Sequence, residues 1–371
     1  PEGRERPRHR FIGGLIPDHL REMGIELKKG FSRLTDLFTR LTEILKDGMD
    51  GEVNIGITSN QAEEWYPLFG SLLSRAQGNW ELWTAFTVED PEDNPPMARW
   101  LTLAESGSLF DIEVNASPIL AAEMLRRNLW NVAYGVLVTS ATLTALGTFD
   151  RFRMRAGLPK AAVTAVVPSP FHHADAGVLR VPDLKADPRD ATAHTAAIIR
   201  ELPALVEGSR GTLVLFSSRK QMQDVFDGLE RDWRKQVFIQ GNLSKQETLN
   251  KHKARVDGGE SSVLFGLASF AEGVDLPGAY CEHVVIAKIP FSVPDDPVEA
   301  ALAEWIEARG GNPFMEISVP DASLKLVQAC GRLLRTEQDR GTITLLDRRL
   351  VTQRYGKAIL NALPPFRREI S

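Results

Sequence analysis

The feature that most constrains the fold is a repeated alternation of short apolar runs and longer amphipathic stretches over the C-terminal two thirds of the chain. Uninterrupted apolar strands that alternate with helices indicate a parallel sheet covered on both faces. We therefore predict an α/β fold, with functional side chains just after the carboxyl ends of the strands. The predicted strands are 135–138, 163–167, 178–181, 212–216, 237–240, 263–267, 284–289 and 342–346, and the clearest helices between them are 193–205, 220–229 and 323–334.

Residues 1–92 have a different pattern, in which apolar side chains recur every three or four positions. This spacing predicts amphipathic helices in a hairpin or bundle, with Gly30 breaking the first stripe into two helices. A proline-rich linker, Pro91–Pro96, follows, and the period then changes to two, which predicts strands over 97–103 and 109–114. Ser117 and Pro118 are expected to cap a helix that runs to about Trp130.

The charge of the chain is −5, so the molecule as a whole is not a basic binder of polyanions. Between Gln328 and Arg368, however, nine Lys or Arg residues face three Asp or Glu residues, which fits either a phosphate-facing surface or a solvated basic tail. The two cysteines, Cys281 and Cys330, predict no disulfide framework and fit a reducing compartment. A Cys281–His283 metal site is possible in principle, but a buried strand is the favoured reading. We predict no membrane span, because no apolar run approaches about 18 residues.

Gln328–Arg335 is the sharpest candidate site. On a helix, Gln328, Arg332 and Arg335 lie on one face at spacings of four and three. Two guanidinium groups on one face suit a triphosphate, Gln328 is placed to orient an attacking water, and Gly331 permits close backbone approach. A salt-bridged helix face is the alternative, because Glu337 and Asp339 are close in sequence.

Three other polar segments follow predicted strands. Thr139, Ser140 and Thr142 follow the strand 135–138, and Ser217 and Ser218 follow the strand 212–216. Hydroxyls at the start of a helix suit a phosphate, and helix capping explains them equally well. The segment 269–278 carries two carboxylates between glycines, which fits a site for water, ribose or a cation partner, or a plain turn.

In this order, these segments resemble motifs III, IV, V and VI of superfamily 2 helicases. The residues within these motifs are similar to those of the XPD-like branch, and of DinG/YoaA-type ATP-dependent DNA helicases in particular. The match covers roughly residues 97–371, whereas residues 1–92 resemble the family only in position and helical character, where its arch domain lies. The matching segments are Val138–Leu143, Ser169–Phe171, Leu215–Ser218, Ser269–Asp275, Lys288–Phe291, Pro294–Pro297, Gly331–Arg335, Asp347–Leu350, Tyr355–Lys357 and Ala362–Pro365.

The resemblance implies a RecA-like (P-loop NTPase-type) parallel sheet with helices on both faces, preceded by a helical arch. The expected domains are an arch-like segment over 1–95, the closing strands of a first RecA-like domain over 96–165, and a second RecA-like domain over 166–371. Because the other strands of that first domain are missing from the sequence, the strands over 96–165 would have an uncovered edge and would need another chain or segment to pair with.

The resemblance also implies roles for single residues in 5′-to-3′ unwinding of DNA in repair or replication. The arginine fingers are Arg332 and Arg335, and Gln328 places the water. The implied nucleotide-linked residues are Glu272, Gly273, Asp275 and Gly331; the implied contacts to the single-stranded DNA backbone are Ser217, Ser218 and Ser269; and Thr139, Ser140 and Thr142 couple hydrolysis to strand movement.

The sequence lacks a Gly-x-x-x-x-Gly-Lys-Ser/Thr motif, an Asp-Glu-Ala-His box and a four-cysteine cluster motif. We therefore expect the chain to be a C-terminal half that begins just after the Asp-Glu-Ala-His box. ATP and Mg²⁺ belong to the intact enzyme and an iron–sulfur cluster to its N-terminal half, so this chain alone is expected to bind none of them and to hydrolyse no ATP. The expected partners are single-stranded or forked DNA, the N-terminal motor domain and a protein partner of the arch, in a bacterial cytoplasm near the nucleoid.

Two alternatives belong to other functional classes. The first is a non-enzymatic RecA-like module that binds nucleic acid or docks a partner, and the sequence upstream of Pro1 would separate it from a helicase. The second is a small-molecule α/β enzyme, for which His172 and His173 are the only candidate base; we expect them in a loop instead.

Overall fold

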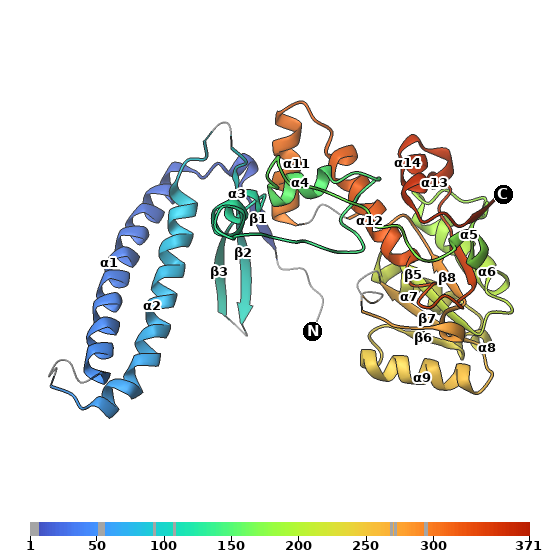
Figure 1. Ribbon diagram of the computed structural model, residues 1–371, viewed down its shortest axis with the longest axis horizontal. Helices are drawn as coiled ribbons and strands as arrows, with labels where there is room; N and C mark the ends of the chain where they lie inside the picture. Colours follow the sequence, from blue (N-terminus) through green and yellow to red (C-terminus); the bar gives the residue numbers. More distant parts are fainter. Residues whose placement is uncertain are drawn as a thin grey trace. The chain divides into compact units, whose positions relative to one another are not determined.

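The computed structural model describes residues 7–50, 56–91, 94–106, 109–267, 270, 273–292 and 296–371. The chain divides into two compact units (Figure 1). The first comprises Pro1–Ala121 and Val293–Pro313, and the second comprises Ala122–Ser292 and Phe314–Ser371. The expected boundaries near residues 95 and 165 therefore differ from this division, in which a short C-terminal segment returns to the first unit.

The first unit contains an antiparallel hairpin of two long helices, α1 (Asp18–Met49) and α2 (Ser59–Thr87), drawn in blue in Figure 1. Helices were predicted here, but the predicted break at Gly30 is wrong, because α1 continues through it. A side chain at position 30 would meet nothing within 4 Å. Glycine in a helix costs about 1 kcal/mol, and packing along the hairpin offsets this local cost.

An antiparallel sheet completes the first unit, in the order β1 (Arg8–Arg10), β2 (Met97–Ser106) and β3 (Leu109–Pro118). The predicted strands over 97–103 and 109–114 are therefore present, but they pair with each other and do not enter the parallel sheet. The two-residue connection between them permits only antiparallel pairing. The 3₁₀ turn η1 (Ile12–Gly14) and α11 (Pro297–Ala308) also belong to this unit.

Arg99 ties the first unit together from the middle of β2. Its guanidinium is buried and makes two hydrogen bonds to the carboxylate of Asp90, at 2.5 and 3.1 Å. It also donates to the backbone oxygens of Ala85, Val88 and Gly14. A buried guanidinium needs such complete pairing, and here the pairing fixes the end of α2 against the sheet.

The second unit is built on a seven-stranded sheet in the order β10-β4-β9-β8-β5-β7-β6, in which every pair is parallel. This confirms the predicted α/β class. The strands are β4 (Gly177–Val181), β5 (Gly211–Phe216), β6 (Val237–Ile239), β7 (Ser262–Leu267), β8 (His283–Ile286), β9 (Gly341–Leu345) and β10 (Arg367–Ile370). The sequence analysis predicted six of them and missed β10, whose side chains are all exposed.

Alternate residues of the central strands enter two separate cores. Leu213 and Leu215 face one core, which α12 (Val319–Cys330) and α14 (Arg354–Ala362) cover. Val214 and Phe216 face the other, which α6 (Ala191–Leu205) and α7 (Arg219–Gly228) cover. Both faces of the central strands are buried, so these strands are largely apolar, and helices flank the sheet on both sides (Figure 1).

The other elements of the second unit are shorter or lie at its edges. They are α3 (Ala122–Leu125), the π-helix η2 (Arg126–Trp130), α4 (Asp150–Ala156), α5 (His173–Ala176), α8 (Arg231–Arg234), α9 (Lys245–Asp257), the 3₁₀ turn η3 (Gly278–Cys281), the π-helix η4 (Phe314–Ser318) and α13 (Arg349–Thr352).

The predicted strands over 135–138 and 163–167 do not form, although both segments are apolar. Neither has a ladder partner among the described residues, and their side chains are open to solvent: Leu137 is 90% exposed and Val163 is 95% exposed. A strand needs a neighbour to pair its N–H and C=O groups, so an apolar pattern without a neighbour stays extended and unpaired.

Candidate functional site

The turn that follows α12 carries the strongest sequence candidates. Gln328 lies in the last turn of α12, but the helix ends at Cys330, and Arg332 and Arg335 lie beyond it. The predicted single helical face of three residues is therefore wrong. Gly331 forms the C-cap, and a Cβ there would come no closer than 3.5 Å to its neighbours, an ordinary contact.

Both arginines reach the same loop, the one that follows β7. Arg332 donates from Nη1 to the carbonyl oxygen of Val274 at 2.9 Å, and Arg335 donates from Nε to Oδ1 of Asp275 at 2.7 Å. Gly273 turns the chain there with a φ of 70°, in the left-handed region that favours glycine. The structure thus brings together two predicted arginines and two predicted loop residues from segments that are far apart in sequence.

Asp339 organises this turn, although the sequence analysis gave it no role beyond that of a nearby acid. Its buried carboxylate accepts hydrogen bonds from the backbone N–H groups of Arg335, Thr336 and Gly278, at 2.7, 2.8 and 3.1 Å, and from the Thr336 hydroxyl at 2.7 Å. Burial alone would raise the pKa of Asp339, but these hydrogen bonds outweigh burial and lower it. One carboxylate therefore fixes the arginine turn to the loop before η3.

Gln328 has a partner in another predicted motif. Its Nε2 donates to the hydroxyl of Thr142 at 3.3 Å. Ser140 accepts from the N–H of Thr142 at 3.3 Å, which makes a local turn, and Thr139 and Ser140 are exposed. Of the three predicted coupling residues, Thr142 is thus the one whose side chain contacts the arginine-bearing segment.

The predicted DNA contacts lie at the carboxyl end of β5. Ser217 and Ser218 are exposed, and the Ser218 hydroxyl accepts from the N–H of Gln221 at 3.2 Å, which makes it the N-cap of α7. The capping explanation therefore holds for Ser218 and leaves Ser217 in the preceding turn. Ser269 and Glu272 lie outside the described residues.

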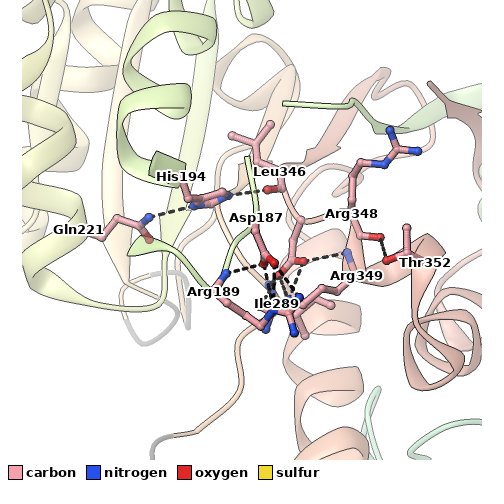
Figure 2. A network of polar contacts seen from close by, with 10 residues as sticks. Asp187, Arg189, His194, Gln221, Ile289, Leu346, Arg348, Arg349 and Thr352 are labelled. Atoms are coloured by element: carbon pink, nitrogen blue, oxygen red, sulfur yellow. Dashed lines mark hydrogen bonds and ion pairs between the residues drawn. The ribbon is translucent and has the colours of Figure 1, made fainter. Parts of the chain in front are cut away.

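Figure 2 shows a polar network at the same edge of the sheet, beyond β8 and β9. The fully buried carboxylate of Asp347 accepts from the N–H of Ile289 at 3.0 Å and binds the Arg349 guanidinium at 2.7 and 2.9 Å. Buried His194 bridges the carbonyl of Leu346, at 2.7 Å, and the Gln221 amide, at 3.1 Å. Burial is the main cause that lowers the pKa of His194. The network therefore links the start of α7 to the ends of two neighbouring strands.

The weaker candidates have structural explanations. Cys281 and His283 are buried around β8, and His283 is hydrogen-bonded to the Thr344 hydroxyl at 2.7 Å, as a buried strand requires. His173 starts the short helix α5, where a loop was expected, and its ring lies edge-on to Phe366. Within the described ranges, His, Cys, Asp and Glu side chains form no group of three suited to a metal ion.

Among the helices of the described residues, none combines the length and the apolar character that a bilayer span requires.

Comparison with known proteins defines the class of this fold and site. Residues 202–366 match the family model described as a helicase C-terminal domain. The solved structure "XPD_APO" aligns with a TM-score of 0.53 and 14% identity over 89% of this chain and 62% of that chain, and "XPD_Helicase" aligns with a TM-score of 0.52 and 14% identity over 98% and 65%. At this identity the alignments show a shared fold alone, which in the second unit is the RecA-like parallel sheet flanked by helices.

Sequence relatives give the particular family. The ATP-dependent DNA helicase DinG of Photobacterium profundum is 39% identical over 98% of this chain and 52% of its own length. The DinG of Escherichia coli K12 is 32% identical over 99% of this chain and 51% of its own length. The chain is a DinG/XPD-like superfamily 2 helicase C-terminal region, and it spans about half the length of the curated relatives it matches.

Proposed function

We propose that this chain is the C-terminal half of an ATP-dependent helicase that unwinds DNA in the 5′-to-3′ direction during repair or replication, in a cytoplasmic, nucleoid-associated setting. The observation that carries the proposal is the turn at Arg332–Asp339, where two arginines are aimed across the loop at Gly273–Asp275. The similar proteins are ATP-dependent DNA helicases by name, which supports the same activity.

In this proposal ATP and Mg²⁺ bind to an N-terminal motor domain, and Arg332 and Arg335 neutralise charge on the transferring phosphoryl group. The Arg335–Asp275 pair is exposed, so it holds the guanidinium weakly and releases it at little cost. Gln328 places the attacking water, and its contact with Thr142 couples nucleotide state to the strand-moving segment. The N-terminal half would also hold the iron–sulfur cluster.

The exposed apolar segments 135–138 and 163–167 support the need for that second half. In this proposal they complete the sheet of the N-terminal motor domain, which supplies the ladder partners that the described residues do not. Ser217, Ser218 and Ser269 contact the DNA backbone, and the helical hairpin of the first unit is free for a protein partner.

The test is ATP hydrolysis in the presence of single-stranded DNA, by this chain alone and by the chain joined to its N-terminal motor half. The chain alone is expected to show no turnover, because arginine fingers need a bound nucleotide. The joined protein is expected to lose about 10³-fold or more of its turnover in Arg332→Ala, with Arg340→Ala as a matched arginine control. Arg332-dependent turnover by the chain alone would refute the division of labour.

Binding to single-stranded DNA by this chain separates the helicase from other α/β enzymes. Affinity should fall steeply with added salt and should not depend on base sequence, as phosphate contacts require. A DNA-binding chain whose parent lacks ATPase activity would favour the non-enzymatic module.

A further inference from the structure

Aromatic side chains gather at the edge of the motor sheet that carries the predicted DNA contacts. The rings of Phe291, Phe314 and Tyr355 lie 5.1–5.7 Å apart between centroids, two of the pairs nearly perpendicular and one tilted by 42°. Phe314 is 40% exposed, whereas the other two rings are partly buried beneath it. An exposed ring braced by two others is a rigid surface for stacking.

A held cation extends this cluster. The Arg349 guanidinium lies 5.6 Å from the centroid of the Phe291 ring, and the buried carboxylate of Asp347 fixes it there through two strong hydrogen bonds. Both residues follow β9, and Phe291 follows β8, so the two neighbouring strands present cation and rings at one edge. Cationic and aromatic groups together favour an aromatic ligand that carries negative charge.

Lys288 is the second cation of this edge. It follows β8, whose neighbour β5 leads into Ser217, and the N–H of the preceding residue, Ala287, donates to the carbonyl of Leu215 in β5. Its ammonium has no hydrogen bond or ion pair with any residue in the described ranges. Burial, followed by the nearby charge of Arg349, lowers the pKa of Lys288, so the site favours an added anion.

The carboxylates near Lys288 are already engaged. Asp347 is bound by Arg349, and Asp187 by Arg189 at 2.7 and 3.0 Å (Figure 2). Asp190 caps α6 through two backbone N–H groups. These carboxylates act on Lys288 through their charge without a hydrogen bond to it, and an added anion would supply a direct partner.

We propose that Phe314, braced by Phe291 and Tyr355, is a stacking platform for a base of single-stranded DNA, and that Lys288 contacts a phosphate of the same strand. This proposal rests on the proposed function and extends it, because the predicted serines contact the backbone alone. The DNA track then crosses the ends of β5, β8 and β9 in succession. Stacking tolerates any base, so the platform adds affinity without sequence preference.

The test measures binding of the 371-residue chain to a labelled oligothymidylate and to a strand of equal length without bases, by fluorescence anisotropy. Phe314→Ala should weaken binding to oligothymidylate by about 5- to 140-fold and leave binding to the abasic strand unchanged. Phe314→Leu, which keeps apolar packing, should behave like Phe314→Ala, and Phe314→Trp should retain the wild-type affinity. Circular dichroism confirms that each variant is folded.

Lys288→Ala should weaken binding to both strands equally and should reduce the slope of log affinity against log salt by about 0.7. The matched control is Lys253→Ala, because Lys253 is also partly buried and lies 5.3 Å from the centroid of the Tyr280 ring, at the opposite edge of the sheet. It should bind both strands like the wild type.

Two results would overturn the platform: Phe314→Ala and Phe314→Leu that bind oligothymidylate like the wild type, or that lose affinity for both strands alike. If the wild-type chain still binds in a salt-dependent way, only the platform fails and the proposed function stands. If the wild-type chain binds neither strand, DNA binding by this half fails with it.

Discussion

Two apolar regions of the second unit differ in burial and in strand pairing. The central strands β5 and β8 are buried on both faces and paired on both sides, whereas 135–138 is exposed and without a ladder partner among the described residues. Their compositions are similar, so composition did not separate them. This difference shows that an apolar run becomes a strand only under two conditions. Neighbouring strands must complete its backbone hydrogen bonds, and packed helices must remove its side chains from water.

The largest effect that tests this contrast comes from one substitution made in each region. Leu213 in β5 is fully buried, and Leu137 is 90% exposed. Leu213→Ala should lower the free energy of unfolding by about 2–5 kcal/mol, through lost burial and the cavity it leaves. Leu137→Ala should change it by less than about 0.5 kcal/mol. Urea titration followed by circular dichroism measures both.

The matched residues control for the side chain itself. Equal losses of unfolding free energy in the two variants would mean that 135–138 is packed in solution and does not differ from β5 in burial. The same pair of variants can be made in the chain joined to the proposed N-terminal motor half. If that half supplies the missing neighbours of 135–138, Leu137→Ala should then lower the free energy of unfolding.

The same contrast explains which strands could be predicted from the sequence. Six strands of the parallel sheet were predicted correctly, because each is a short Val/Ile/Leu run between helical stretches. β10 was missed, because its exposed residues carry no apolar signal, and two strands were predicted that lack neighbours in the described chain. Residue patterns report what a segment prefers, but they do not report which segments are present to pair with it.

The site shows a similar limit. The helical spacing of Gln328, Arg332 and Arg335 predicted that both arginines lie on α12, whereas they lie in the turn beyond it. Sequence patterns did not single out Asp339 or Lys288, because the groups around them include segments distant in sequence. A buried acid shortly after an arginine pair was the available signal for Asp339.

Asp339→Asn is expected to have the next largest effect, because it removes charge from a carboxylate that accepts four hydrogen bonds. The free energy of unfolding should fall by about 1–3 kcal/mol at neutral pH. The folded state lowers the pKa of Asp339 below its ordinary value of 3.8, so this stabilisation is complete above that value and is lost as pH falls through the lower folded pKa.

Urea titrations of wild type and variant between neutral pH and pH about 3 measure this difference. The gap between the two should narrow at the acid end. A gap independent of pH would show that the charge of Asp339 does not stabilise the arginine turn. Asp275→Asn is the control, since Asp275 is 67% exposed and should cost little stability.

Asp321 anchors the segment that joins the two unpaired runs. It pairs with Arg151 and, at 3.6 Å, with Arg155, and these contacts hold α4 against α12. Asp321→Asn should cost about 1 kcal/mol, and amide exchange should rise over 150–156 while it stays unchanged in β5. Hydrogen exchange with mass spectrometry measures both. The exposed pair of Asp224 and Lys220 provides the control Asp224→Asn, which should alter neither region.

The smallest expected effect concerns the hydrogen bond from the Gln328 side chain to the Thr142 hydroxyl. A double-mutant cycle of Gln328→Ala and Thr142→Val should give a coupling free energy of less than about 0.5 kcal/mol for stability, because the Gln328 side chain is exposed and the bond is long at 3.3 Å. In the joined protein the same pair should couple far more strongly in DNA-stimulated ATP turnover than in stability. Coupling of equal, small size in both measurements would show that this contact only packs the two segments together and does not couple hydrolysis to strand movement.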